Sequence, residues 1–354
     1  MSKKTILINA MMINDKPTGL GVYAINLLKE LLPMLSDFQI TLVVNSIPEN
    51  MQFSKVINLI EIDQSNFIKR NYQIKKCIEN STFDIYYSLS QHYFKNRSLV
   101  TIITIHDLIP LLYPEGRLHQ HFYYKYLLPF YLKKTNKVIT VSNSTKDDII
   151  KYYGYDNVEV VYCGSNYSKS IVNYNSEKKN YLMVGIHYPY KNLHFVIKTF
   201  SKIANNTNDN LIIIGNKNCK YGQYLQKLID DLNMKDRIKM LGFVSEETKV
   251  HYYQNSKALI FPSKYEGFGL PIIEAMSFGI PVLCSNSSSL PEVGNSAAVY
   301  FENDNEKSLL NALNSIEDKN RRDKLIEKGY KNIERFNWKK TADEIYNIIN
   351  RSIL

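Results

Sequence analysis

The sequence predicts an α/β protein with two doubly wound parallel sheets. Short apolar runs of strand length alternate with helical patterns along most of the 354 residues, and this order produces parallel sheets with helices on both faces. The length favours two domains over one. The alternation stops at the polar stretch 171–180, which lacks apolar periodicity, and then begins again.

That interruption sets the expected domain boundaries. We assign residues 1–170 to the first domain, 171–180 to a linker, 181–335 to the second domain and 336–354 to a last helical segment. The expected strands are 5–10, 40–44, 85–87, 99–105, 137–141, 158–162, 181–185, 210–214, 238–243 and 258–261. The clearest helical patterns cover 22–32, 193–203 and 221–233.

Composition and charge exclude several classes of protein. Hydrophobic residues make up 44% of the chain, which is enough for two cores and argues against disorder. The four cysteines form no Cys-x2-Cys pair, so neither a zinc site nor a disulfide framework is indicated, and a reducing cytoplasm fits. The net charge of +10 favours anionic partners, but it is spread evenly, with 19 basic and 14 acidic residues up to Ser170 and 25 and 20 after it. We therefore expect no nucleic-acid partner.

The sequence also bears on membrane attachment. No apolar run approaches the roughly 20 residues of a membrane span. The short run after Lys3 and Lys4 lacks a cleavage-like segment, so we interpret it as the first strand and not as a signal peptide. A cytoplasmic protein, soluble or peripheral to the membrane, is expected.

The most informative stretch is 258–276. The strand 258–261 leads into a loop with Gly267 and Gly269, which permit conformations or close approaches that a side chain would obstruct. Pro271 suits the first turn of a helix that we expect to begin near Leu270. The first N–H groups of that helix have no intrahelical partner and lie at the positive end of its dipole, which predicts a phosphate site.

Two glutamates flank this predicted anion site. Glu266 precedes the helix and Glu274 lies near its start, and carboxylates accept hydrogen bonds from hydroxyl groups. A ligand with phosphate in the middle and hydroxyl-rich groups on both sides is a nucleotide-sugar. The alternative is a capped core helix with two solvated glutamates.

The segment Glu-Gly-Phe-Gly-Leu-Pro-Ile-Ile-Glu, residues 266–274, resembles the Glu-x7-Glu motif of retaining GT-B glycosyltransferases, especially glycosyltransferase family 4. The resemblance covers nearly the whole chain. It implies two Rossmann-like domains facing a cleft, a nucleotide held mainly by the second domain, and a last helix that crosses back to the first. The implied reaction moves a hexose from a nucleoside diphosphate sugar to an acceptor hydroxyl, with retention of configuration and with no protein base assigned.

The resemblance also implies roles for residues of the second domain. Glu274 would hold the ribose hydroxyls and Glu266 the hydroxyls of the donor sugar. Lys191 would neutralise the diphosphate, while Tyr190 occupies a place that often holds Arg, so Lys264 is a candidate for the missing cation. The loop and helix start that would contact the donor are Gly267, Phe268, Gly269 and Leu270.

In the first domain, polar residues and glycines follow the expected strands. Gly19 and Gly21 come after the first strand, but Ala24 breaks a Gly-x-Gly-x-x-Gly pattern, so a nicotinamide site is poorly supported. By resemblance this loop faces the donor phosphate and the acceptor. The alternative is a helix-entry turn with no ligand.

His106 and Asp107 follow the strand 99–105, and ligands of such sheets bind outside the carboxyl ends of the strands. The segment His-Asp-Leu-Ile-Pro is similar to one in family 4 mannosyl- and rhamnosyltransferase-like proteins, whose His reaches the donor sugar. Asp107 is interpreted as a loop or positioning residue. Ser142 and Asn143 are further cleft candidates, while Asn143 or Ser144 is expected to cap the next helix if neither binds a ligand.

The segment 117–134 interleaves basic and aromatic residues. Such a surface suits an anionic lipid headgroup region. The other interpretation, an ordinary helix that buries its aromatic face in the domain, is the one we favour.

The expected partners are a nucleotide-sugar donor and a saccharide or lipid-linked saccharide acceptor. Since the sequence contains no Asp-x-Asp, the resemblance implies metal-independent transfer with no cofactor. GDP-mannose and a growing surface polysaccharide are the first choices, with UDP-glucose, UDP-N-acetylglucosamine and dTDP-rhamnose left open. A nucleotide-sugar epimerase or phosphorylase of the same fold, and a non-catalytic sugar-nucleotide-binding subunit, are the alternatives.

Overall fold

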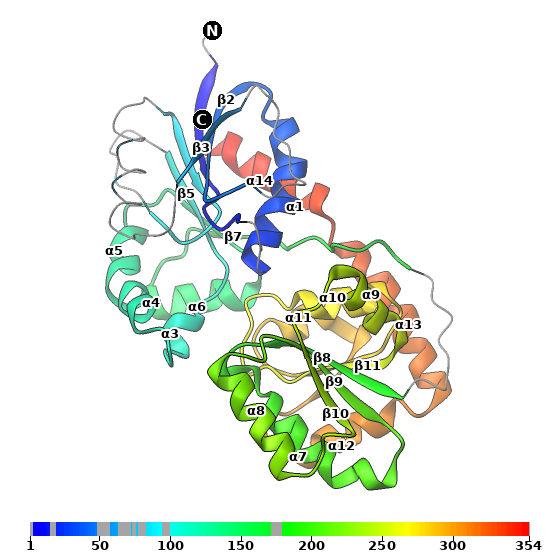
Figure 1. Cartoon of the computed structure of the whole chain (residues 1–354). Helices are drawn as coiled ribbons and strands as arrows, with labels where there is room; N and C mark the ends of the chain where they lie inside the picture. The colour runs from blue at the N-terminus through cyan, green and yellow to red at the C-terminus, as the bar shows by residue number, and fades with distance from the viewer. Residues whose placement is uncertain are drawn as a thin grey trace. The chain divides into compact units, whose positions relative to one another are not determined.

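The chain forms two compact units, each built on one parallel sheet (Figure 1). A computed structural model describes residues 3–14, 19–47, 57–62, 72, 76, 83–93, 100–170 and 179–353. Unit 1 comprises residues 1–164 and 337–354, and unit 2 comprises residues 165–336. The sheets have seven strands in the order β3-β2-β1-β4-β5-β6-β7 and six in the order β10-β9-β8-β11-β12-β13. The predicted fold class, with two doubly wound parallel sheets, is confirmed.

The division between the units differs from the predicted boundary at residue 170. Hydrogen bonds explain the difference, because the Ser165 N–H donates to the Phe336 carbonyl at 3.1 Å and the Ser170 N–H to the Ser277 carbonyl at 2.9 Å. The stretch 165–170 is therefore fastened to unit 2. Of the predicted linker, residues 171–178 lie outside the described residues and Asn180 already begins a strand.

In unit 1, helices cover both faces of the sheet. Apolar side chains of β5 and β6 pack with Tyr124, Leu128 and Leu132 in one cluster, while α1 and α14 pack against each other. The strands are β1 Lys4–Asn9, β2 Phe38–Val44, β3 Asn58–Glu61, β4 Ile85–Ser88, β5 Val100–Ile105, β6 Lys137–Thr140 and β7 Val158–Val160. The helices are α1 Gly19–Met34, α3 Ile109–Leu112, α4 Leu118–Phe122, α5 Leu128–Leu132, α6 Asn143–Tyr153 and α14 Trp338–Arg351, with a π-helical turn η1 at Tyr123–Leu127.

The last helix, α14, belongs to unit 1. Its apolar side buries Trp338, Ala342 and Ile345, and the Trp338 ring lies 5.6 Å from the Tyr23 ring of α1, centroid to centroid. Gly164 is required beside it, since a Cβ at Gly164 would lie 2.4 Å from the Trp338 backbone nitrogen. The chain thus returns to unit 1 after unit 2 is complete.

Unit 2 has α7, α8 and α12 on one face of its sheet and α9, α10 and α11 on the other (Figure 1). Its strands are β8 Asn180–Ile186, β9 Asn210–Gly215, β10 Ile238–Gly242, β11 Ser256–Phe261, β12 Val282–Ser285 and β13 Ala298–Phe301. Its helices are α7 Leu193–Ile203, α8 Lys220–Asp231, α9 Glu246–Asn255, α10 Leu270–Ser277, α11 Leu290–Gly294, α12 Glu306–Ser315 and α13 Lys319–Asn332. Short 3-10 turns are η2 Pro189–Lys191, η3 Ala204–Asn206, η4 Asn295–Ala297 and η5 Ile333–Arg335.

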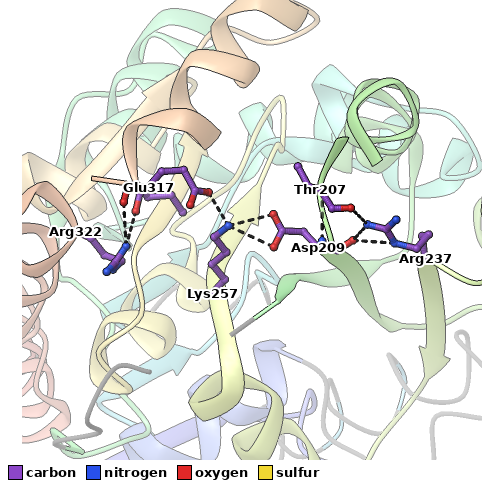
Figure 2. A network of polar contacts seen from close by, with 7 residues as sticks. Thr207, Asp209, Arg237, Lys257, Glu317 and Arg322 are labelled. Atoms are coloured by element: carbon purple, nitrogen blue, oxygen red, sulfur yellow. Dashed lines mark hydrogen bonds and ion pairs between the residues drawn. The ribbon is translucent and has the colours of Figure 1, made fainter. Parts of the chain in front are cut away.

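Charged side chains fasten the amino-terminal edge of the second sheet (Figure 2). Lys257, at the start of β11, lies between Asp209 at 3.1 Å and Glu317 at 2.6 Å. The Arg237 guanidinium donates to the carbonyls of Ala204 and Thr207, each at 2.8 Å. These bonds satisfy charges and carbonyls within the protein, so this edge has a structural role.

No helix in the described ranges is both long and apolar enough to cross a bilayer.

Candidate functional site

The amino end of α10 has no side-chain cap among the described residues. The helix begins at Leu270, as predicted. Gly269 precedes it with φ 107°, and a Cβ there would come within 2.9 Å of Leu290 Cδ2. A glycine is required at this position for conformation and for space.

The loop before this helix end is held by hydrogen bonds from two serines that lie just before α11. Ser289, which is fully buried, donates its hydroxyl proton to the carbonyls of Glu266 and Phe268, with both distances 2.9 Å. The Glu266 N–H in turn donates to Ser288 Oγ at 2.8 Å. The backbone from Glu266 to Gly269 is therefore held in place before any ligand binds.

Glu266 forms a buried ion pair. Its Oε1 lies 2.6 Å from Lys191 Nζ, which comes from η2 after the carboxyl end of β8. Glu266 is only 8% exposed. Gly185 lies beside this lysine, and its φ of 104° is a conformation that favours glycine. The first predicted glutamate and the predicted diphosphate lysine thus meet in one place.

Glu274 is held by two residues of α9. Lys249 Nζ lies 3.0 Å from its Oε1, and the Tyr253 hydroxyl donates to its Oε2 at 2.7 Å. Burial, followed by the nearby Glu274 charge, raises the pKa of Tyr253 well above its ordinary value, so the phenol stays protonated and remains a donor. Each carboxylate oxygen has two lone pairs, and Glu274 can still accept bonds from ligand hydroxyls.

Lys264, the proposed substitute cation, is paired with a carboxylate of its own. Its Nζ lies 2.6 Å from Asp304 Oδ2, and its backbone N–H donates to the Tyr190 carbonyl at 2.8 Å. The pKa of Asp304 is lowered, because hydrogen bonds to Lys264 and Asn192 outweigh the opposing effect of burial, which is the largest single contribution. The Asp304 carboxylate therefore neutralises part of the positive charge of Lys264.

His106 lies at the carboxyl end of β5 in unit 1, as predicted. Its Nε2 is 2.8 Å from the Leu89 carbonyl, and the Tyr23 ring packs edge-on against it with centroids 4.6 Å apart. Burial lowers the pKa of His106 to about 4. A carbonyl accepts only, so Nε2 carries the proton and Nδ1 of the neutral ring is an acceptor.

Ser142 has a structural role. It is fully buried and is the N-cap of α6, accepting from the Thr145 N–H at 3.1 Å. The cap expected from Asn143 or Ser144 is thus corrected, because α6 already begins at Asn143. Asn143 is exposed and donates to the Tyr162 hydroxyl at 3.1 Å.

The remaining predicted residues of unit 1 lie beside two helix starts. Asp107 accepts from the Ile109 N–H at 2.9 Å and so holds the turn into α3. Gly19 and Gly21 fall in the first turn of α1, not in a preceding loop. A Cβ at Gly19 would meet nothing within 4 Å. Residues 15–18, the rest of the predicted glycine loop, lie outside the described residues.

Both parts of the chain match models of glycosyltransferase families. Residues 165–332 match the glycosyl transferases group 1 model, and residues 17–169 match the glycosyltransferase family 4 model. The chain belongs to the glycosyltransferases. The two matched regions correspond closely to unit 2 and unit 1, so each matched domain of this glycosyltransferase contains one of the two sheets.

Two curated relatives are named as mannosyltransferases. The O-antigen chain mannosyltransferase RfbU of Salmonella typhimurium is 36% identical over 216 residues, which are 61% of this chain and 60% of that protein. The O-antigen chain mannosyltransferase B of Escherichia coli is 28% identical over 284 residues, 75% of this chain and 74% of that protein. The match spans about three-fifths of the first relative's length.

Solved structures of glycosyltransferases share the GT-B fold of this chain. Sucrose-phosphate synthase from Thermosynechococcus elongatus superposes with a TM-score of 0.79 at 18% identity, over 98% of each chain. WaaG, a glycosyltransferase involved in lipopolysaccharide biosynthesis, gives 0.72 at 14% identity, over 97% of this chain and 99% of its own. At these identities the likeness supports the fold alone.

The sequence did not point to Lys249 and Tyr253, the two partners of Glu274. Their helix, α9, buries only one residue, Tyr253, so apolar periodicity gave no signal. A start signal was present, since Ser245 caps the helix and two acidic residues, Glu246 and Glu247, follow it. Once a helix is assumed there, Lys249 and Tyr253 are four residues apart and share one face.

Proposed function

We propose that this glycosyltransferase moves a mannosyl group from GDP-mannose to a hydroxyl of a saccharide acceptor with retention of configuration. The observation that carries the proposal is the pair of buried glutamates, Glu266 and Glu274, each ion-paired with a lysine beside the uncapped start of α10. The mannosyl specificity is supported by the two relatives named as mannosyltransferases.

In the proposed reaction the anomeric C–O bond to the diphosphate breaks, and negative charge grows on the departing phosphate. The amino end of α10 and Lys191 oppose that charge. An ammonium has three N–H donors, so Lys191 can hold Glu266 and a phosphate oxygen together. Glu274 would accept bonds from the ribose hydroxyls, and Glu266 from the sugar.

The acceptor oxygen forms the new bond on the face that the diphosphate leaves. Its proton passes to an oxygen of the departing phosphate, so the products are the mannosylated acceptor and GDP. His106, neutral at physiological pH because burial lowers its pKa to about 4, would accept a hydrogen bond from the donor sugar through Nδ1 and would not act as an acid. The reaction is proposed to need no metal.

The setting we propose is the cytoplasmic face of a membrane, with a growing lipid-linked surface polysaccharide as acceptor. The support is that both relatives are named as O-antigen chain mannosyltransferases. Nucleic acid is not expected as a partner.

A thermal-shift panel of GDP, UDP, dTDP and ADP at one fixed concentration tests the donor, since the tightest-binding nucleotide raises the melting temperature most. GDP should give the largest shift. Product analysis with GDP-mannose and an acceptor saccharide, with and without EDTA, should then yield an α-linked mannoside in both cases. Consumption of donor without an acceptor saccharide would favour an epimerase or phosphorylase, while GDP binding with no turnover would favour a non-catalytic subunit.

A further inference from the structure

The exposed face of the segment 118–134 is the largest cluster of exposed large apolar side chains in the described part of the chain, and three of its four main members are aromatic. The side chains of Leu118, Phe122, Tyr126 and Phe130 are 76%, 55%, 55% and 53% exposed. They recur every four residues along the α4-η1-α5 segment, so they follow one side of it. We call these four residues the aromatic row.

The π-helical turn keeps the row together. Four residues exceed one α-helical turn, so positions spaced by four drift around a regular helix. The wider turn η1, Tyr123–Leu127, contains more residues per turn and counters that drift. The rings of Phe122 and Tyr126 accordingly lie 5.1 Å apart, centroid to centroid.

The opposite side of the segment is firmly anchored in unit 1. Tyr124, Leu128 and Leu132 are buried in the cluster formed with β5 and β6. The Tyr123 hydroxyl donates to the Gln91 carbonyl at 2.7 Å, and Tyr153 donates to the Tyr124 carbonyl at 2.9 Å. The aromatic row is thus presented on a fixed support, and its exposure is not a consequence of missing helix packing.

Basic side chains flank the row without acidic neighbours in sequence. Residues 117–134 contain four basic residues and no acidic residue. Lys125, Lys133 and Lys134 are exposed, and Lys134 Nζ lies 3.8 Å from the Phe130 ring centroid. Aromatic rings and the stems of lysines suit the boundary between headgroups and acyl chains, while ammonium groups meet anionic heads.

We propose that the aromatic row with Lys125, Lys133 and Lys134 docks on an anionic lipid bilayer. A protein partner would have to bring acidic groups to match these lysines, whereas an anionic leaflet supplies them uniformly. This inference rests on the proposed function for one point, the lipid-linked acceptor. Docking would hold unit 1 at the membrane surface where that acceptor lies. The expected burial of the aromatic face is confirmed for Tyr124 and is wrong for Phe122, Tyr126 and Phe130.

Vesicle co-sedimentation of the full chain tests the proposal. Wild type should bind vesicles of phosphatidylcholine with 30% phosphatidylglycerol, should bind pure phosphatidylcholine far less, and should be released by salt. The variant Phe122→Ser/Tyr126→Ser/Phe130→Ser should bind at least about tenfold more weakly. The variant Lys125→Gln/Lys133→Gln/Lys134→Gln should lose about tenfold to a hundredfold, specifically on anionic vesicles.

Matched controls come from unit 1. Tyr152→Ser removes another exposed aromatic ring with a lysine beside it, Lys151, whose Nζ is 5.1 Å from the ring centroid. Lys29→Gln/Lys339→Gln/Lys340→Gln removes three exposed charges elsewhere. Both should bind like wild type, because neither touches the row.

Absence of wild-type binding to anionic vesicles would overturn the proposal. Equal losses of vesicle binding in the control variants would also overturn it. So would a wild-type dimer in light scattering that becomes a monomer in the aromatic variant, because the row would then be an interface between two copies. The row variant should retain the GDP thermal shift and the transfer of mannose to a water-soluble acceptor. If every variant and the wild type fail to transfer mannose, that result counts against the proposed function. Vesicle binding still tests the membrane-docking proposal in that case.

Discussion

The carboxyl-terminal edges of the two sheets differ in charge. In unit 1 the buried polar side chains described at this edge are uncharged, among them His106 with its pKa lowered to about 4 by burial and the capping Ser142, while the half-buried Asp107 holds the turn into α3. In unit 2 the same edge carries the ion pairs Lys191–Glu266 and Lys249–Glu274. One sheet architecture thus offers two chemistries. The charged edge suits a nucleoside diphosphate and the neutral edge suits sugar hydroxyls, and the variants below test that contrast.

The largest effect is expected at Lys191. Lys191→Met removes the cation proposed to oppose charge on the leaving diphosphate, so kcat/KM for the donor should fall by about 100-fold or more. It also leaves Glu266 buried without its partner, which should cost roughly 1–3 kcal/mol of unfolding free energy. Steady-state kinetics and urea unfolding measure the two effects.

Lys202→Met is the matched control for this prediction. Lys202 also pairs with a glutamate of unit 2, Glu306, but its side chain is 61% exposed against 16% for Lys191. Loss of such an exposed pair should change stability by less than about 1 kcal/mol and leave kcat/KM unaltered. Unchanged donor affinity in Lys191→Met would remove Lys191 from the donor site.

The second effect tests the neutral edge through pH. The pKa of His106 is about 4 in the folded chain against 6.5 when exposed, so the unfolded chain binds a proton that the folded unit excludes. The free energy of unfolding should therefore fall as pH drops from about 6.5 towards 4, by roughly 2–4 kcal/mol in total. His106→Gln should abolish this part of the pH dependence.

Trp338 offers a direct reporter for that measurement. It is the single tryptophan of the chain and belongs to unit 1, where Tyr23 contacts both its ring and the His106 ring. Urea unfolding followed by its fluorescence at pH 7.5 and pH 5 isolates unit 1. His119→Gln, at an exposed histidine of the same unit, should keep the wild-type pH dependence. An unchanged slope in His106→Gln would refute the assignment of a neutral, buried imidazole.

The third effect concerns Tyr253, which donates to Glu274. Tyr253→Phe leaves Glu274 Oε2 without that donor at 2.7 Å, so the carboxylate loses part of its orientation. KM for the donor should rise about tenfold, with kcat little changed, because ribose contacts bind ground and transition states alike. Tyr252→Phe, at the neighbouring residue of α9, should match wild type. A fall in kcat with constant KM would contradict a positioning role.

The sequence predicted the architecture and the centre of the charged edge because both depend on local patterns. Apolar runs gave most strands, and Gly269 with Pro271 gave the start of α10. It missed β3, β12 and β13, each of four residues, because periodicity cannot distinguish such short runs from other structure. It also could not say which cation meets which carboxylate, since Lys249 and Glu274 are 25 residues apart and meet only through packing of α9 beside α10.

The same limit applies to the segment 117–134. Its apolar spacing indicated a helix with one buried aromatic side, and the buried Tyr124 fits that reading. The wider turn η1 depends on which carbonyl each N–H reaches, a choice that residue spacing does not encode. The sequence therefore indicated a basic and aromatic segment, but which of its rings are exposed became visible only with the structure.

The smallest effect is expected at Lys264, and its sign carries the information. Because Asp304 lies 2.6 Å from Lys264 and neutralises part of its charge, Lys264→Met should weaken donor binding only about threefold. Asp304→Asn should strengthen it by a similar factor, since the freed ammonium can turn to a phosphate. Calorimetric titration with GDP measures both. Opposite shifts in GDP affinity would make Lys264 the second cation of the charged edge, in place of the Arg absent at Tyr190. No shift in either variant would mean that Lys191 opposes the diphosphate charge without help from Lys264.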